Sequence, residues 1–184
     1  MNPRDIPNLI TAFRFLLVPP LVILLLNERF GAALILFGVA GFSDGLDGYL
    51  AKRYGWTSRL GELMDPLADK LLLVSSFVTL GWLGWIPLWL VVLVVLRDLI
   101  IVGGAIVFHM HVEHIEAAPS MISKLNTLAQ ILLVLAVIFS QAIHSLPALL
   151  MELLIYTVLA TTAWSGFDYV WIWGRKAWFK RGKA

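Results

Sequence analysis

Six long apolar segments constrain the fold of this chain more than any other feature. They lie at residues 8–27, 31–51, 62–82, 86–108, 121–143 and 148–173. Each is close to the roughly 20 residues that an α-helix needs to cross a bilayer. Apolar residues make up 60% of the chain, against about 45–50% in a soluble domain. The sequence therefore predicts an all-α integral membrane bundle of six transmembrane helices, as one domain over residues 1–184.

Positive charge predicts the orientation of this bundle, because cytoplasmic segments carry an excess of Lys and Arg. We count the Lys and Arg residues that flank the six segments. With the amino terminus in the cytoplasm, Arg29 would be the only one of them outside the cell. The cytoplasmic side would hold Arg4, Lys52, Arg53, Arg59, Arg175, Lys176, Lys180, Arg181 and Lys183. We therefore expect both termini in the cytoplasm.

Composition excludes several classes of function. The chain has no cysteine, which removes disulfides, thiolate zinc sites and cysteine nucleophiles. Its net charge of +2 gives no reason to expect a nucleic-acid partner. The amino terminus lacks the basic region and cleavage site of a signal peptide, so we expect the first apolar segment to remain as a membrane helix.

Two pairs of aspartates stand inside the second and third segments. Asp44 and Asp47 are three residues apart, and Asp65 and Asp69 are four apart, so each pair shares one face of its helix. A carboxylate at the centre of a span costs about 2.5–3.5 kcal/mol on insertion scales. The charge of these four carboxylates must be compensated by a partner. Converging carboxylates form a hard-oxygen site for Mg²⁺ or Mn²⁺.

Small and basic residues accompany the two acidic pairs. Gly48 and Ala51 lie on the face of the first pair, and Gly61 lies on the face of the second. Their size lets a ligand or a neighbouring helix approach the backbone closely. The turn between the two segments contains Lys52, Arg53 and Arg59, which would supply affinity for phosphate.

Two other interpretations of the carboxylates stay open. They could form salt bridges inside the membrane, with Asp65 or Asp69 paired to Lys70 or Arg97, although the matched spacing on both helices would then be a coincidence. A small ion transporter could instead use the carboxylates as a relay, but this interpretation explains neither the glycines nor the basic turn.

The stretch from Asp44 to Asp69 resembles the signature of the CDP-alcohol phosphatidyltransferases. That signature, D-x2-D-G-x2-A-R-x8-G-x3-D-x3-D, has eight fixed positions across 26 residues. One position departs from it, because Lys52 stands where the family has Arg. The positive charge is kept, but the bidentate fork of a guanidinium is lost.

This resemblance implies an enzyme that moves the phosphatidyl group of CDP-diacylglycerol to an alcohol and releases CMP. It implies that Asp44, Asp47 and Asp65 bind Mg²⁺ or Mn²⁺, with two ions at the site, and that Asp69 both contributes to the metal and acts as general base. The residues implied to contact CDP are Asp44, Asp47, Gly48, Ala51, Lys52, Gly61 and Asp65.

The resemblance also bears on assembly and location. The family implies a homodimer in a lipid membrane, and we expect a bacterial cytoplasmic (inner) membrane with the active site facing the cytoplasm. A catalytically inactive scaffold is a poor alternative, because all four aspartates of the signature are present.

Other stretches resemble the branch of the family with glycerol-based acceptors, namely Pro7–Arg14, Arg97–Asp98 and Ser123–Gln130. The last of these, with Gly174–Lys176, is more similar to eukaryotic-type cardiolipin synthases than to phosphatidylglycerophosphate synthases. We therefore expect phosphatidylglycerol as the acceptor and cardiolipin as the product, with glycerol 3-phosphate as the alternative acceptor.

The acceptor would be bound by cationic and polar side chains of the first, fourth and fifth segments. The candidates are Arg14, Arg97, Lys124, Asn126 and Thr127. Two alternatives stay open here. Asp98 could neutralise Arg97 locally, and the polar side chains could simply form hydrogen bonds between helices.

Overall fold

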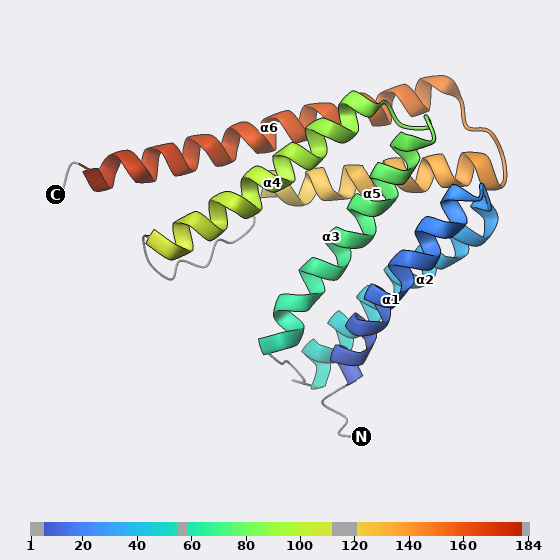
Figure 1. Cartoon of the computed structure of the whole chain (residues 1–184), viewed down its shortest axis with the longest axis horizontal. Helices are drawn as coiled ribbons and strands as arrows, with labels where there is room; N and C mark the ends of the chain where they lie inside the picture. Colours follow the sequence, from blue (N-terminus) through green and yellow to red (C-terminus); the bar gives the residue numbers. More distant parts are fainter. Residues whose placement is uncertain (1–5, 55–58, 112–120, 182–184) are drawn as a thin grey trace. The chain divides into compact units, whose positions relative to one another are not determined.

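The structure, a computed structural model, describes residues 6–54, 59–111 and 121–181. These residues form six α-helices and no strand (Figure 1). The helices are α1 (Ile6–Leu26), α2 (Phe30–Tyr54), α3 (Arg59–Trp82), α4 (Leu88–His111), α5 (Met121–Ala142) and α6 (Ala148–Arg181). The predicted all-α class and the six helices are confirmed. The sixth helix runs to Arg181, past the predicted end at residue 173, because helical geometry continues beyond its apolar part.

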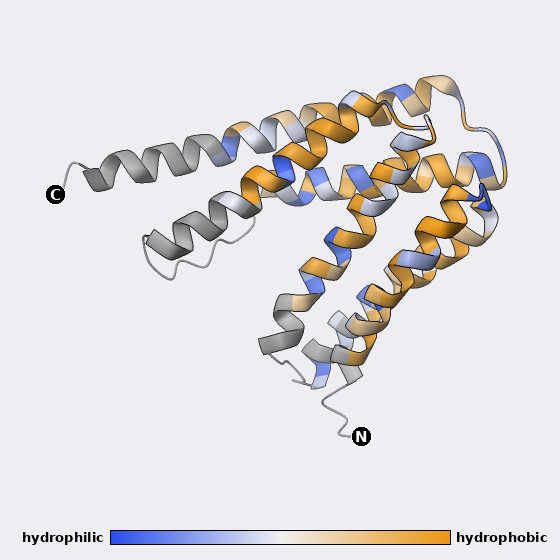
Figure 2. Ribbon diagram, in the orientation of Figure 1, coloured by the Kyte–Doolittle hydropathy of each residue, from blue (hydrophilic) through white to orange (hydrophobic). Residues whose placement is uncertain are grey.

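Three of the helices are long and apolar enough to cross a membrane, as judged over the described residues. The apolar spans are Leu9–Leu26 in α1, Met121–Ala142 in α5 and Ala148–Tyr169 in α6. In α2 the apolar part is shorter, Phe30–Leu46, because charged residues occupy its second half. Figure 2 shows this apolar character along the ribbon. Long apolar helices with exposed apolar side chains are those of a membrane protein.

Two residues with positive φ angles end helices. Glu28 follows α1 with a φ of 55°, and Gly84 follows α3 with a φ of 82°. The N–H three positions after the last residue of each helix is bonded in the pattern of a Schellman motif: Arg29 N donates to Leu24 O, and Trp85 N donates to Leu80 O, both at 2.9 Å. Such bonds satisfy the last carbonyls of a helix. They end α1 and α3 sharply.

The helices form two compact units. The first unit comprises Met1–Ile86 and Val134–Leu146, and the second comprises Pro87–Leu133 and Pro147–Ala184. In the first unit α1 packs against both α2 and α3, around the buried residues Leu21, Leu25, Phe37, Ala40, Phe77 and Leu80. In the second unit α4 packs against α6. The single domain over residues 1–184 stays a prediction.

Candidate active site

The acidic face of α3 meets one face of α1. Thr11 Oγ1 donates a hydrogen bond to Asp65 Oδ1, and Arg14 Nη1 donates one to Asp69 Oδ1. Thr11 and Arg14 are three residues apart on α1, and the two aspartates are four apart on α3. Spacings of three and four both return to the same side of a helix. The two helices therefore match one polar residue to one carboxylate on successive turns.

Arg14 also reaches the acidic face of α2. Its Nη1 atom lies 2.9 Å from Asp44 Oδ1, so one guanidinium nitrogen contacts carboxylates of two different helices. The Arg14 side chain is 1% exposed, whereas those of Asp44 and Asp69 are 48% and 46% exposed. A buried cation is costly without an anion. The two aspartates neutralise Arg14 and still present part of each side chain at the surface.

This arrangement decides among the predicted pairings of Asp69 and Arg97. Asp69 pairs with Arg14, and Arg97 pairs with Asp98 in the second unit. A salt bridge between Asp69 and Arg14 was not among the sequence alternatives, because helix spacing tells which residues share a face but not which helix that face meets.

The donor set fits a divalent cation in its chemistry. Asp44 and Asp69 direct one oxygen each toward the same point, and Asp65 lies one turn from Asp69. Carboxylate oxygens are the ligands that Mg²⁺ and Mn²⁺ prefer. Among the described side chains, however, no group of three acidic or histidine residues is close enough to hold a metal ion. The metal centre therefore stays a prediction.

Several residues of the signature fall where no side chain is described. Asp47, Ala51 and Lys52 belong to α2 and Gly61 belongs to α3, but their side chains lie outside the described residues. Gly48 is described, and a Cβ atom built on it would meet nothing within 4 Å. The surface of α2 is thus open one turn after Asp44, where the CDP moiety is expected.

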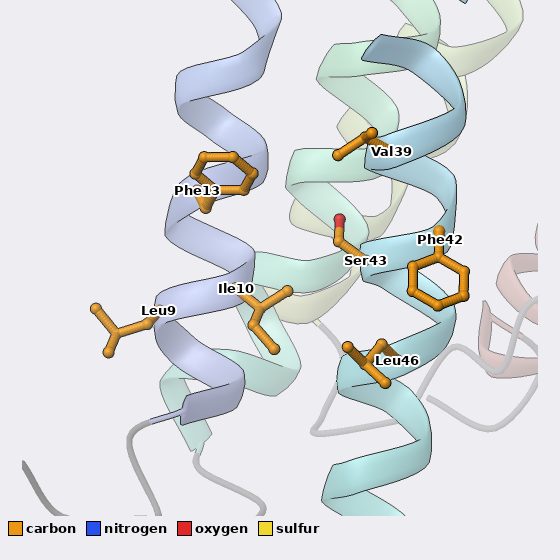
Figure 3. A pocket seen from close by; sticks show the side chains of 7 residues that line it. All are labelled: Leu9, Ile10, Phe13, Val39, Phe42, Ser43 and Leu46. Atoms are coloured by element: carbon orange, nitrogen blue, oxygen red, sulfur yellow. The ribbon is translucent and has the colours of Figure 1, made fainter. Parts of the chain in front are cut away.

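An apolar groove lies beside the acidic cluster, between α1 and α2 (Figure 3). It has a volume of ≈ 360 Å³ and is lined by Leu9, Ile10, Phe13, Val39, Phe42, Ser43 and Leu46. The hydroxyl of Ser43 donates to Ala40 O at 2.7 Å, so even this polar side chain turns back to its own helix. Phe13 and Ser43 directly precede Arg14 and Asp44 in the chain. The groove lining therefore includes chain neighbours of both members of the ion pair.

In the second unit, the side chain of Arg97 forms hydrogen bonds that link three helices. From α4, its Nη1 donates to Asp98 Oδ1 at 2.9 Å, and its Nη2 donates to Ser123 Oγ of α5 at 2.8 Å and to Ser165 Oγ of α6. The guanidinium carbon also lies 6.0 Å from the ring centroid of Tyr169. Ser165 and Tyr169 were missed at the sequence level. For Ser165, the only signal in the sequence was a small polar residue inside an apolar segment.

The remaining predicted acceptor ligands also belong to the second unit, whereas Arg14 belongs to the first. Lys124 is exposed and Asn126 is buried. Asn126 Oδ1 accepts hydrogen bonds from Thr161, at 3.0 Å, and Thr162, at 2.8 Å. Thr127 Oγ1 donates to the carbonyl of Ser123 at 3.2 Å. Asn126 thus bonds between helices, as one alternative held, and the acceptor site stays a prediction.

Comparison with known proteins identifies the class to which this fold and acidic signature belong. Residues 4–164 match the model of the CDP-alcohol phosphatidyltransferase family, which extends over both units. The chain belongs to this family, and the resemblance seen in the sequence is confirmed.

Individual relatives narrow the comparison. The chain is 32% identical to the cardiolipin synthases (CMP-forming) of Rattus norvegicus and Homo sapiens, over 95% of its own length and 63% of theirs. It is 30% identical to the CDP-diacylglycerol--glycerol-3-phosphate 3-phosphatidyltransferase of Bacillus subtilis, over 90% of its own length and 93% of the relative. The chain thus spans less than two thirds of the two synthases but nearly the whole length of the bacterial enzyme.

Proposed function

We propose that this protein transfers the phosphatidyl group of CDP-diacylglycerol to a glycerol-based alcohol, with release of CMP. The observation that carries the proposal is the convergence of Asp44 of α2 and Asp69 of α3 on one buried cation, within the complete set of signature aspartates of the family. An ion relay would not need this signature. A transporter would also release no CMP, which separates the two functions experimentally.

Phosphatidylglycerol is the acceptor we propose, with cardiolipin as product. The similarity to two cardiolipin synthases over 95% of the chain supports it. Glycerol 3-phosphate is the second candidate, supported by the nearly full-length match to the Bacillus subtilis enzyme. The proposed acceptor ligands are Arg14, Arg97, Lys124, Asn126 and Thr127.

The proposed chemistry assigns separate tasks to the four aspartates. Asp44, Asp47 and Asp65, with a contribution from Asp69, would hold two Mg²⁺ or Mn²⁺ ions. When bound, these ions would neutralise the pyrophosphate and stabilise the attacking and leaving oxygens. Asp69 would accept the proton of the acceptor hydroxyl, which has too high a pKa to attack unaided. The half-exposed side chain of Asp69 is accessible to an acceptor. The hydroxyl oxygen would bond to the phosphorus that carries diacylglycerol, and the bond to CMP would break.

The CDP moiety would lie along α2 and α3. The open surface at Gly48 supports this, and Ala51 and Gly61 would allow the same close approach, with Lys52 near the phosphates. The apolar groove between α1 and α2 would hold part of one acyl chain of CDP-diacylglycerol. Its apolar lining and its position beside Arg14 and Asp44 support this assignment.

We also propose the membrane arrangement that the sequence predicts. The protein would be a homodimer of six-span protomers with both termini in the cytoplasm, in a bacterial cytoplasmic (inner) membrane. The excess of Lys and Arg in the predicted cytoplasmic segments supports this orientation. It would put the acidic cluster near the cytoplasmic side, where CDP-linked lipid and a soluble CMP product can be exchanged.

Product analysis tests the proposed function. Purified protein in nanodiscs would receive CDP-diacylglycerol with phosphatidylglycerol or with glycerol 3-phosphate, and mass spectrometry would identify the lipid formed. We expect cardiolipin and CMP with the first acceptor, abolished by exhaustive chelation and restored by Mg²⁺ or Mn²⁺. Phosphatidylglycerophosphate alone would select the second acceptor. Absence of CMP with both acceptors would contradict the proposal.

A further inference from the structure

Arg14 occupies the point on which the two acidic helices converge. Its Nη1 atom contacts Asp44 Oδ1, at 2.9 Å, and Asp69 Oδ1. Mg²⁺ bound by the same two oxygens would lie about 2.0–2.1 Å from each of them, in the space that this nitrogen fills. The guanidinium is enclosed, with 1% of the side chain exposed. A metal ion held by both of these oxygens at this point would therefore have to displace the Arg14 nitrogen.

Asp44 and Asp69 are arranged around the guanidinium of Arg14. No three acidic or histidine side chains in the described part of the chain are close enough to form a metal site. Asp65 is engaged separately, by the hydroxyl of Thr11. Both Asp44 and Asp69 are about half exposed, so each has room to turn. A divalent ion bound at the point between Asp44 and Asp69 would require a rearrangement in which their contact with Arg14 opens.

We propose that Arg14 is the resident counter-ion of the metal site. It holds Asp44 and Asp69 together before metal binds, and it is displaced from them when metal binds. Without a cation between them, two neighbouring carboxylates repel each other, so Arg14 compensates their charge until a metal ion takes its place. The displaced guanidinium then becomes available to a phosphate group, for which its planar fork is suited.

This inference rests on the proposed metal-dependent function, and Mn²⁺ binding without substrate tests it. Full-length protein in nanodiscs is titrated with Mn²⁺, and free Mn²⁺ is followed by electron paramagnetic resonance. Wild-type protein is expected to bind, and D44N to bind poorly. R14Q is expected to bind at least about tenfold more tightly than wild type, because no competing contact has to open first. R14K, which keeps a compact charge, is expected between the two.

The matched control is R29Q, which removes a cation from an exposed position directly before α2. Arg29 is fifteen residues from Asp44, about 22 Å along the helix axis, which exceeds the screening length of about 8–10 Å at moderate ionic strength. Its Mn²⁺ affinity is expected to equal that of wild type. Equal tightening in R29Q and R14Q would show a general charge effect and would overturn displacement.

A second measurement uses wild-type protein, so it can be made even if R14Q does not fold. Phenylglyoxal modifies accessible guanidinium groups, and mass spectrometry of the peptide containing Arg14 reports the rate. The enclosed Arg14 is expected to react slowly without metal and several-fold faster with Mn²⁺ bound. Bound Mn²⁺ with unchanged shielding of Arg14 would overturn the displacement alone. No Mn²⁺ binding, or equal binding by D44N, would overturn the metal site and the inference together.

Discussion

Arg14 and Asp44 form an ion pair at 2.9 Å between the first two helices of the chain. They are 30 residues apart in sequence, and the same guanidinium nitrogen also contacts Asp69 of α3. Three helices are therefore joined at one charged point beside an apolar groove. Ionisable residues inside an apolar bundle cost free energy and usually mark a functional site. The proposed phosphatidyl transfer is a function that explains this cluster.

Replacing the proposed general base should slow the reaction, while Asp44 still pairs with the buried Arg14. We expect D69N to lower kcat about 10²–10⁴-fold, because the amide cannot accept the proton of the acceptor hydroxyl. CMP release from CDP-diacylglycerol and acceptor measures the rate. The control is E152Q, which neutralises an exposed carboxylate of α6 in the second unit and should retain wild-type activity. Near-wild-type release by D69N would remove the base assignment.

Arg97 should prove to be important for stability. Its side chain and that of Asp98 are 5% and 8% exposed, so R97M would remove the guanidinium that pairs with a buried carboxylate. A loss of about 3–5 kcal/mol in unfolding free energy is expected, with partial recovery in R97M/D98N. Thermal unfolding in nanodiscs measures the change.

The exposed Lys124 provides the stability control, and K124M should change the unfolding free energy by less than about 0.5 kcal/mol. A large loss of unfolding free energy in K124M, with little loss in R97M, would contradict a structural role for Arg97. An R97M protein with unchanged stability but a raised KM for the acceptor would show that Arg97 acts only as the proposed acceptor ligand.

The positive φ angle of Gly84, which follows α3, can be tested by substitution. G84A should destabilise the protein by about 1–2 kcal/mol, because Ala is strained at a φ of 82°. No atom lies within 4 Å of the added Cβ, so a steric clash cannot account for the loss.

The matched control is G31A, at a helical glycine of α2 whose Cβ would also meet nothing within 4 Å. Ala is the better helix former by about 1 kcal/mol, so G31A should be neutral or stabilising. The apparent melting temperature should therefore fall in G84A and stay unchanged or rise in G31A. A common shift would show that the φ angle of Gly84 is not the cause.

Filling the groove should separate long-chain from short-chain donors. I10W adds a large side chain between α1 and α2 at the groove wall (Figure 3). We expect a raised KM for long-chain CDP-diacylglycerol and little change for a short-chain analogue, since only the longer chain needs the filled space. Kinetics with both donors measures this.

A control for the groove variant is L16W, at an exposed position of α1 that does not line the groove. It should affect neither donor. Equal losses with both donors in I10W would indicate a damaged fold, and unchanged KM values would exclude the groove as an acyl-chain site.

The acidic faces of α2 and α3 show how far the sequence reached. Spacings of three and four residues identified the polar faces, and six apolar runs located the helices to within a few residues at most ends. Both features are local, because helical periodicity and hydrophobicity are properties of consecutive residues. The chemistry of the proposed donor site follows from the same local pattern, through the identity and order of the four aspartates.

The partners of the buried arginines depended on tertiary structure. Arg14, predicted only to meet phosphate, lies between Asp44 and Asp69, and Arg97 joins Ser123 and Ser165 of two other helices. A buried cation must find an anion or hydrogen-bond acceptors, but the helix that provides them is set by packing between segments distant in sequence. By itself, the sequence determined which helices form and which faces are acidic. Only the tertiary structure decided that α1 places a guanidinium where those faces converge.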